Sequence, residues 1–373
     1  MSETKRIGVL LPSSNMYPSI GVQLVRGIRL GFNLPENRLI ELVTEDIGLG
    51  ASKELVRQKT QKLLLEDVDA IIAFISNPVA ESLRTLIHTE QRPFIVVNVG
   101  ANLPMGEPSP HVFYHTLNCW ENVFVAAHKL ATEGAKKIVL ATSFYDSGYQ
   151  TGVALDEGLK AGGAEIVWRH ITQEAPTEQD MNYFQQALAE IKPDHVIGIH
   201  SGPSAVAFIR GYQQLELQKK HPLSVVGLTC EDSLIESMGN AIHGINCFQP
   251  WSVHLPHAAN KEFIVHYSRK HKQAPMLFAL LGYGASSMLN KTLPENDEDW
   301  SEKLRELNWS GPQGSVSFEG QSSVSPQYHF VGKYEESKGR LDHLATLDPK
   351  GSPMHEQVST QAHSGWFNPY LCV

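Results

Sequence analysis

The chain has 373 residues, of which 42% are hydrophobic and 19% charged, and it contains 29 glycines and 21 prolines. This composition is typical of a folded chain with two or three domains, and it excludes disordered, collagen-like and coiled-coil proteins. The 40 acidic residues outnumber the 31 basic ones and give a net charge of −9, so no nucleic-acid partner is expected.

Short β-branched runs alternate with amphipathic stretches of helical length through the first hundred residues. We expect strands at 7–11, 39–44, 70–75 and 94–97, and helices at 19–32, 52–66 and 78–88. In the first of these helices Ile20, Leu24 and Ile28 recur every four residues and define one apolar face. This alternation predicts an α/β fold with parallel strands and crossover helices.

The same alternation restarts after a segment at 119–133. We expect strands at 137–141, 165–170, 195–199 and 224–228, and helices at 149–161, 179–191, 203–215, 256–271 and 275–290. Residues 312–331 alternate polar and apolar side chains like an antiparallel ribbon, whereas 338–373 carry a weak structural signal. The pattern therefore predicts two lobes of one architecture, with no flexible linker between them.

The apolar run at 7–11 ends at Pro12 and is too short for a secretory leader, and the segment at 274–285 is too short to span a bilayer. We expect a soluble protein that is cytoplasmic as written, or periplasmic or on the cell surface if a leader is removed or lies upstream. The four cysteines form no CxxC pair, which favours buried free thiols. A bridge between Cys230 and Cys247 stays open for an exported protein.

Patterns for metal binding and catalysis are weak. His254 and His257 have HxxH spacing but no evident third ligand, so no metal site is expected. Ser201 and Ser204 lie in HSGPSAV, which lacks the GxSxG elbow of a hydrolase. We therefore expect neither an enzyme nor a bound cofactor.

Six segments carry a family resemblance. They are IGVLLPSSN, AIIAFISNPVAESL, FIVVNVGANLP, KKIVLATSFYDSGYQTGVALDEGLKAGG, HVIGIHSGPSAVAFIRGY and GPQGSVSFEG. Their order and spacing over residues 5–335 resemble the type I periplasmic-binding-protein fold. Within that fold they resemble the branched-chain amino acid (leucine/isoleucine/valine) receptor-like substrate-binding proteins of ABC transporters.

The resemblance implies two Rossmann-like parallel-sheet lobes joined by a three-crossing hinge. The crossings are expected near 116–118, 248–251 and 326–328. The N-terminal lobe then comprises 5–117 plus 250–326, and the C-terminal lobe 118–249 plus 327–345. Residues 346–373 remain a tail of uncertain structure.

In open α/β sheets a ligand lies outside the carboxyl ends of the strands, so the loops that follow the strands hold the candidate residues. In the first lobe these are Ser14, Tyr17, Ser76, Asn77, Gly100, Ala101 and Asn102. The resemblance implies that the turns at Ser76 and at 100–102 hold a ligand carboxylate. Asn102 stands where the family commonly has a small hydroxyl residue, which leaves the ligand's identity open. Ser76 and Asn77 are equally well explained as an ordinary helix cap.

The second-lobe candidates are Tyr145, Ser147, Ser201 and Glu231. The resemblance implies an aromatic or hydroxyl residue after the first strand of this lobe, and an acidic residue near Glu231 that pairs with a ligand ammonium. Glu231 and Asp232 also open a helix, where the dipole favours carboxylates whatever the ligand.

These features favour a substrate-binding protein that captures a small amino acid, or a related amide or carboxylate, between two lobes by hinge closure. Its partner would be an ABC-transporter permease. The alternative is a cytosolic sensor of the amide-responsive type, which would use the same fold and act on a regulatory protein. Neither role needs nucleic acid or membrane insertion.

Overall fold

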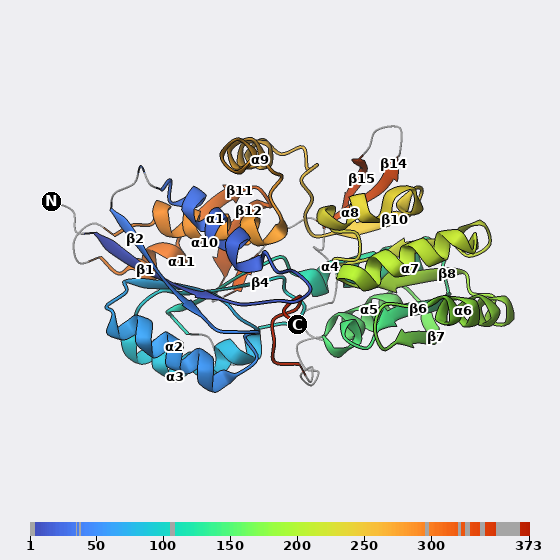
Figure 1. The fold of residues 1–373 in the computed structure, drawn as a ribbon, viewed down its shortest axis with the longest axis horizontal. Coiled ribbons are helices and arrows are strands. Elements are labelled where there is room, and N and C mark those ends of the chain that lie inside the picture. The colour runs from blue at the N-terminus through green and yellow to red at the C-terminus, as the bar shows by residue number, and fades with distance from the viewer. Residues whose placement is uncertain are drawn as a thin grey trace. The chain divides into compact units, whose positions relative to one another are not determined.

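The computed structural model describes residues 4–34, 36, 39–104, 109–294, 298–319, 322–324, 329–335, 340–347 and 366–373. The chain divides into two compact units (Figure 1). The first unit is Met1–Leu117, Pro256–Gln327 and Trp366–Val373, and the second is Asn118–Leu255 and Tyr328–Gly365. Each unit contains one β-sheet whose strands alternate with helices along the chain, as the sequence predicts.

The sheet of the first unit has the strand order β11-β12-β13-β5-β4-β3-β1-β2 among the described residues. Its strands are β1 (Lys5–Leu11), β2 (Ile40–Asp46), β3 (Ala70–Phe74), β4 (Phe94–Asn98), β5 (Val112–Thr116), β11 (Asn308–Gly311), β12 (Gly314–Glu319) and β13 (Ser322–Val324). Strands β1 to β5 are parallel, and β11, β12 and β13 pair antiparallel with one another. The parallel strands therefore all end at one edge of the sheet, as the ligand argument requires.

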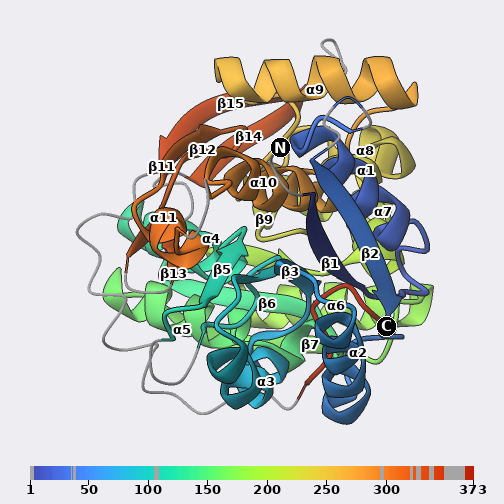
Figure 2. The ribbon, with the colours of Figure 1, turned by 90° about the vertical axis from the view of Figure 1, so that its left-hand side faces the viewer.

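Helices cover both faces of this sheet. They are α1 (Ile20–Gly31), α2 (Lys53–Leu65), α3 (Asn77–Glu90), α9 (Ala258–His271), α10 (Leu277–Lys291) and α11 (Trp300–Arg305). Figure 2 shows α2 and α3 on one face, with α1 and α10 on the other. Helices α1 and α10 approach closely because Gly27 and Gly282 lack side chains: a Cβ on Gly27 would lie 2.0 Å from the Ala279 carbonyl oxygen.

The second unit has the strand order β15-β14-β10-β9-β8-β6-β7 among its described residues. Its elements are β6 (Lys137–Ser143), β7 (Glu165–Thr172), β8 (His195–Ile199), β9 (Leu223–Val225), β10 (Asn246–Gln249), β14 (His329–Glu335), β15 (Arg340–Leu347), α4 (Cys119–Thr132), α5 (Thr151–Ala161), α6 (Glu178–Ile191), α7 (Gly202–Gln214) and α8 (Asp232–Met238). Strands β6 to β10 are parallel, and β14 and β15 are antiparallel. Phe184, Phe208 and Tyr212 are fully buried in its core.

The sequence expectations differ from the structure in several elements, and strands β10 and β15 are two that the periodicity does not predict. Strand β5 and helix α11 were not expected, and β9 stops at Val225 because Gly227 has a φ of +68° and leaves the extended region. The expected ribbon at 312–331 is divided, since β11 to β13 belong to the first sheet whereas β14 pairs with β10 in the second. An alternating pattern predicts strands but not which sheet they join.

The chain leaves the first unit after Leu117 and returns after Leu255. Residues 250–255, which the sequence assigned to the first lobe, therefore group with the second unit. The expected third crossing at 326–328 lies outside the described residues. Residues 366–373, expected as part of an unassigned tail, belong to the first unit.

The four cysteines are buried free thiols. No helix within the described part of the chain is long and apolar enough to cross a membrane.

Candidate functional site

The carboxyl edge of the first sheet is organised by Asn98, the last residue of β4. Its side chain is buried, and its Nδ2 donates to the carbonyl oxygen of Ile75 at 2.9 Å and to Oδ1 of Asn77 at 2.9 Å. Its Oδ1 accepts a hydrogen bond from the N–H of Gly100 at 2.8 Å. One amide therefore fixes the loops after β3 and β4 to each other.

Asn77 extends this network to Asn102, another of the predicted site residues. Its Nδ2 donates to the carbonyl oxygen of Asn102 at 2.7 Å, and both residues are buried. Gly100 has a φ of +69°, a left-handed conformation that a glycine adopts without strain, and this allows the tight turn at 100–102. The structure thus brings Asn77, Gly100 and Asn102 together, with the buried Ala101 between the last two.

Sequence reasoning misses Asn98, because the residue directly follows the apolar run at 94–97 and lies between the predicted strand and the predicted loop. The available signal was a polar residue at the end of a buried parallel strand, where its side chain meets the neighbouring loop. Its amide can make four hydrogen bonds, and three of them are used here.

The two predicted serines of the first unit direct their hydroxyl groups elsewhere. Ser76 occupies the cap position of α3 but makes no side-chain capping bond, and its Oγ donates to the carbonyl oxygen of Phe367 at 2.5 Å. Ser14 Oγ donates to the carbonyl oxygen of Leu371 at 2.6 Å and accepts from the N–H of Tyr17 at 3.0 Å. Both hydroxyl hydrogens are therefore held by residues 366–373.

Tyr17 is 5% exposed and its ring packs edge to face against Phe278, with the ring centroids 5.4 Å apart. Since Phe278 is itself fully buried on α10, the aromatic body of Tyr17 is part of the core of the first unit.

In the second unit, Asp146 is the centre of a buried network at the carboxyl ends of β6 and β8. Its Oδ2 accepts from Ser143 Oγ at 2.5 Å, and its Oδ1 accepts from Ser201 Oγ at 2.7 Å. Asp146 and Ser201 are each 1% exposed. The Ser201 hydroxyl therefore stabilises the junction of two loops, and Asp146 is a second residue that sequence reasoning did not select.

Tyr145 and Ser147 lie on either side of Asp146 in the sequence. The Tyr149 hydroxyl donates to the Tyr145 hydroxyl at 3.0 Å, and Ser147, which is exposed, donates to the carbonyl oxygen of Phe144 at 2.8 Å. A cavity of about 340 Å³ in this unit is lined in part by Thr142, Asp146, Ser147, Tyr149 and Ile199. This volume lies within the range of small-molecule pockets.

The acidic pair that opens α8 has two distinct roles. Glu231 caps the helix, because its carboxylate accepts from the N–H of Ser233 at 3.1 Å. Asp232 accepts from the N–H of Val253 at 2.7 Å and from Ser252 Oγ at 3.1 Å, and burial raises its pKa to about 7. Asp232 thereby anchors residues 252–253 to the second unit, which explains why these residues do not group with the first.

His200 is 1% exposed and stacks on Phe208 with the ring centroids 4.5 Å apart, and burial lowers its pKa to about 3. Its Nδ1 lies 2.9 Å from Ser204 Oγ. A histidine that stays neutral and packed in this way supports the loop and carries no charge for a ligand. Among the residues that the structure describes, no group of three or more His, Cys, Asp or Glu could hold a metal ion.

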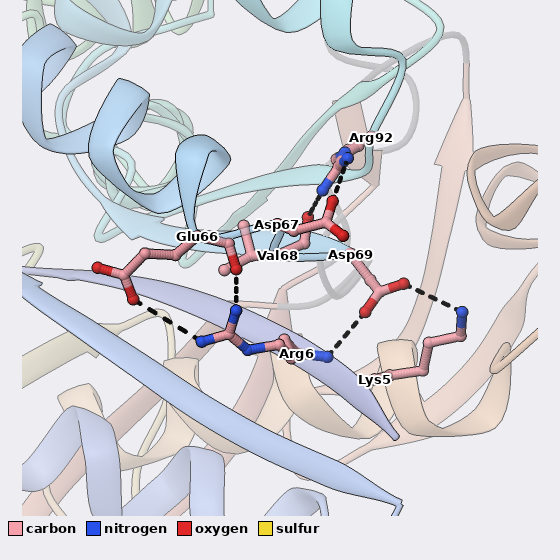
Figure 3. Close-up of polar contacts among 7 residues, drawn as sticks. All are labelled: Lys5, Arg6, Glu66, Asp67, Val68, Asp69 and Arg92. Atoms are coloured by element: carbon pink, nitrogen blue, oxygen red, sulfur yellow. Dashed lines mark hydrogen bonds and ion pairs between the residues drawn. The ribbon is translucent and has the colours of Figure 1, made fainter. Parts of the chain in front are cut away.

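Charged residues gather instead at the amino edge of the first sheet (Figure 3). There Lys5 Nζ lies 3.0 Å from Asp69 Oδ1, and Arg92 Nη2 lies 2.8 Å from Asp67 Oδ1. Arg6 pairs with Glu66, with 3.8 Å between Nη2 and Oε2. These cations and anions compensate each other far from the strand ends that hold the asparagine network.

The comparisons with known proteins agree with this architecture. Leu/Ile/Val-binding protein homolog 6 of Brucella melitensis biotype 1 is 21% identical over 372 residues, which cover 94% of this chain and 94% of the relative. A solved ABC transporter substrate-binding protein from Sphaerobacter thermophilus superposes with a TM-score of 0.80 at 24% identity, over 93% of this chain and 98% of that one. A solute binding protein of an ABC transporter from R. palustris, in complex with benzoate, gives 0.73 at 24% identity, over 93% and 97%.

The family assignment comes from the sequence profile described as periplasmic binding protein, which matches residues 4–335. That range spans both units and includes the carboxyl-edge loops of each sheet. The fold is the one that the resemblance implied, and the chain belongs to the periplasmic binding protein family.

Proposed function

We propose that this protein is the solute-binding component of an ABC transporter and captures a small organic solute that carries a carboxylate or amide group. The observation that carries the proposal is the asparagine-organised turn at 100–102, held beside the start of α3 by Asn98 and Asn77. Backbone N–H groups in a tight turn and at a helix N-terminus attract the negative end of a ligand.

The named ligands of the relatives support this chemistry. The Brucella relative is named for leucine, isoleucine and valine, and the R. palustris protein is bound to benzoate. All four compounds combine a carboxylate with an apolar body. The first unit of this chain offers the same kind of environment, with neutral polar groups at 98–102 beside fully buried apolar strands. The partner in this proposal is a transporter permease, and the site of action is the periplasm or the cell surface.

Binding in this proposal begins at the first unit and ends with closure of the two units on the ligand. The ligand stabilises the closed state by the contacts it gains in that step. No bond is made or broken, and the roles proposed for all the site residues are binding and positioning.

A thermal-shift panel tests the proposed ligand class. Leucine, isoleucine, valine, their amides and benzoate are added to the full chain, and at least one is expected to raise the midpoint of thermal unfolding. Ala101→Pro removes an N–H from the turn and is expected to abolish the shift, whereas Ala101→Gly keeps that N–H and retains it. A panel in which no compound stabilises the wild-type protein would overturn the proposed ligand class.

Cell fractionation distinguishes the transporter role from that of a cytosolic sensor, which the likeness to substrate-binding proteins does not favour. The natural full-length gene is expressed and the protein is followed by immunoblot. We expect it outside the cytoplasm, and a strictly cytosolic protein would contradict the transporter role.

A further inference from the structure

We propose that residues 366–373 form a fixed wall of the ligand site in the first unit, held in place by Ser14 and Ser76. In this view the two serines are positioning residues and not ligand contacts. The inference rests on the proposed function only in treating the carboxyl edge of this sheet as the ligand site.

Hydrogen bonds attach the 366–373 segment to two of the candidate ligand loops. Ser76 Oγ, after β3, donates to the carbonyl oxygen of Phe367 at 2.5 Å, and Ser14 Oγ, after β1, donates to that of Leu371 at 2.6 Å. The N–H of Asn15 donates to the carbonyl oxygen of Val373 at 2.5 Å. The three acceptors are distributed along the segment, so the loops hold its whole length.

Four consecutive residues of the segment, 369–372, are buried. Leu371 and Cys372 are 0% exposed and Tyr370 is 5% exposed, and burial raises the pKa of the Cys372 thiol. A turn closes within the segment, because the N–H of Cys372 donates to the carbonyl oxygen of Pro369 at 3.0 Å and Asn368 Nδ2 donates to that of Cys372 at 2.6 Å. These contacts describe a folded element.

The loop between β2 and α2, with the first residue of α2, also packs against the segment 366–373. Gly50 has a φ of +68°, and a Cβ at this position would lie 3.0 Å from Pro369 Cδ. The Nζ of Lys53 lies 4.5 Å from the centroid of the Phe367 ring. Residues that follow β1, β2 and β3 therefore all contact the segment 366–373.

This burial favours a permanent wall over a plug that a ligand displaces. A small ligand that took the Ser14 and Ser76 hydroxyls for itself would expose Tyr370, Leu371 and Cys372 to water and lose the bonds to three carbonyl groups. With the serine hydrogens committed to the segment, the carboxylate or amide of the ligand is received by the turn at 100–102.

The labelling rate of Cys372 measures whether the segment opens by itself. Unliganded full-length protein is treated with iodoacetamide over a urea series, and modification of Cys372 is followed by peptide mass spectrometry. We expect labelling at least about a thousandfold slower than in a peptide of residues 366–373, with the same urea dependence as global unfolding. Fast labelling that does not depend on urea would show local opening and overturn the wall.

Substitutions at the two serines test their positioning role. Ser14→Ala and Ser76→Ala are expected to speed Cys372 labelling about tenfold each and to lower the free energy of unfolding by no more than the equivalent of that factor, about 1.4 kcal/mol; Ser76→Thr, which keeps the hydroxyl, is expected to restore slow labelling. The matched control is Phe367→Ala, which removes an exposed ring from the same segment and keeps the carbonyl group. The Cys372 labelling rate of this variant is expected to stay within about threefold of the wild-type rate.

The proposed wall at 366–373 and the proposed ligand class are overturned by different results. Alanine variants that keep Cys372 protected but lose a ligand-induced thermal shift would show that the serines contact the ligand, and would overturn the inference. A wild-type protein with protected Cys372 and no shift from any panel compound would support the docked segment and overturn the proposed ligand class.

Discussion

The two edges of the first parallel sheet use polar residues in opposite ways. At the amino edge, charged side chains form partly exposed ion pairs with one another, as in the pair of Lys5 and Asp69, whose side chains are 24% and 29% exposed (Figure 3). At the carboxyl edge, neutral amides and hydroxyls are buried and hydrogen-bonded, with Asn98 5% exposed at the centre. Around Asn98 the protein therefore places neutral donors where a ligand is proposed to bind. The ion pairs of Glu45 with Lys59 and Lys62 lie at the end of the outer strand β2.

The difference has an energetic meaning. A solvated ion pair contributes little to stability because water screens it, and its removal leaves both groups hydrated. Removing one member of a buried network leaves its partners without hydrogen bonds and without water, which costs about 1–3 kcal/mol for each such group. Substitutions in the buried network at the carboxyl edge should consequently lower the free energy of unfolding more than substitutions at the amino edge.

The largest effect is expected at Asn98. Asn98→Ala leaves Asn77 Oδ1, the Ile75 carbonyl and the Gly100 N–H without this partner, so the free energy of unfolding should fall by about 2–4 kcal/mol. Urea unfolding followed by circular dichroism measures the change. Asn182→Ala, at an exposed position of α6, is the control and should change stability by less than about 0.5 kcal/mol. If both variants lost the same free energy of unfolding, the buried network of Asn98 would matter no more for stability than an exposed residue.

A smaller effect is expected from the pH dependence set by Asp232. Its pKa is raised to about 7 by burial, well above the ordinary value of 3.8, so the folded state binds a proton more tightly than the unfolded chain. Its contribution to stability is therefore greatest below about pH 4 and is lost as the pH rises to about 7. Asp232→Asn should flatten the stability profile by about 1–3 kcal/mol over this window.

Glu231 provides the control for that experiment, because it caps the same helix through the Ser233 N–H. Glu231→Gln should leave the slope between pH 4 and 7 in place, apart from a small reduction due to the lost repulsion of Asp232. Asp232 variants that keep the full slope would show that another group titrates there.

The smallest effect is expected at the amino edge. Lys5→Ala removes the ion pair with Asp69 and should lower the free energy of unfolding by no more than about 1 kcal/mol, with the difference shrinking in high salt. Urea unfolding at low and high ionic strength measures both quantities. A loss near that of Asn98→Ala would mean that the two edges are energetically alike.

Much of the architecture follows from sequence periodicity. The apolar runs at 70–75 and 94–97 and the helical spacing of Ile20, Leu24 and Ile28 predict buried strands and an amphipathic helix, because burial itself imposes these periods. The candidate loops could be located because parallel strands end at one edge.

The directions of the side chains could not be predicted in this way. The Ser14 hydroxyl points to Leu371, 357 positions away in the chain, and no local pattern carries that information. Ser76 fits a helix cap by every sequence criterion, yet its hydroxyl makes no capping bond. Asn98 was missed for the same reason, since its role depends on the loop after a neighbouring strand.

The return of residues 366–373 to the first unit has a consequence for biosynthesis. The first unit contains residues from both extremes of the described chain, whereas the described residues of the second unit lie between Asn118 and Leu347. A ribosome releases domains in chain order, so the second unit can be completed while the first still lacks its last piece. Until Leu371 and Cys372 emerge, their buried positions beside the loops after β1 and β3 stay unfilled, and the unit that starts folding first is the one that finishes last.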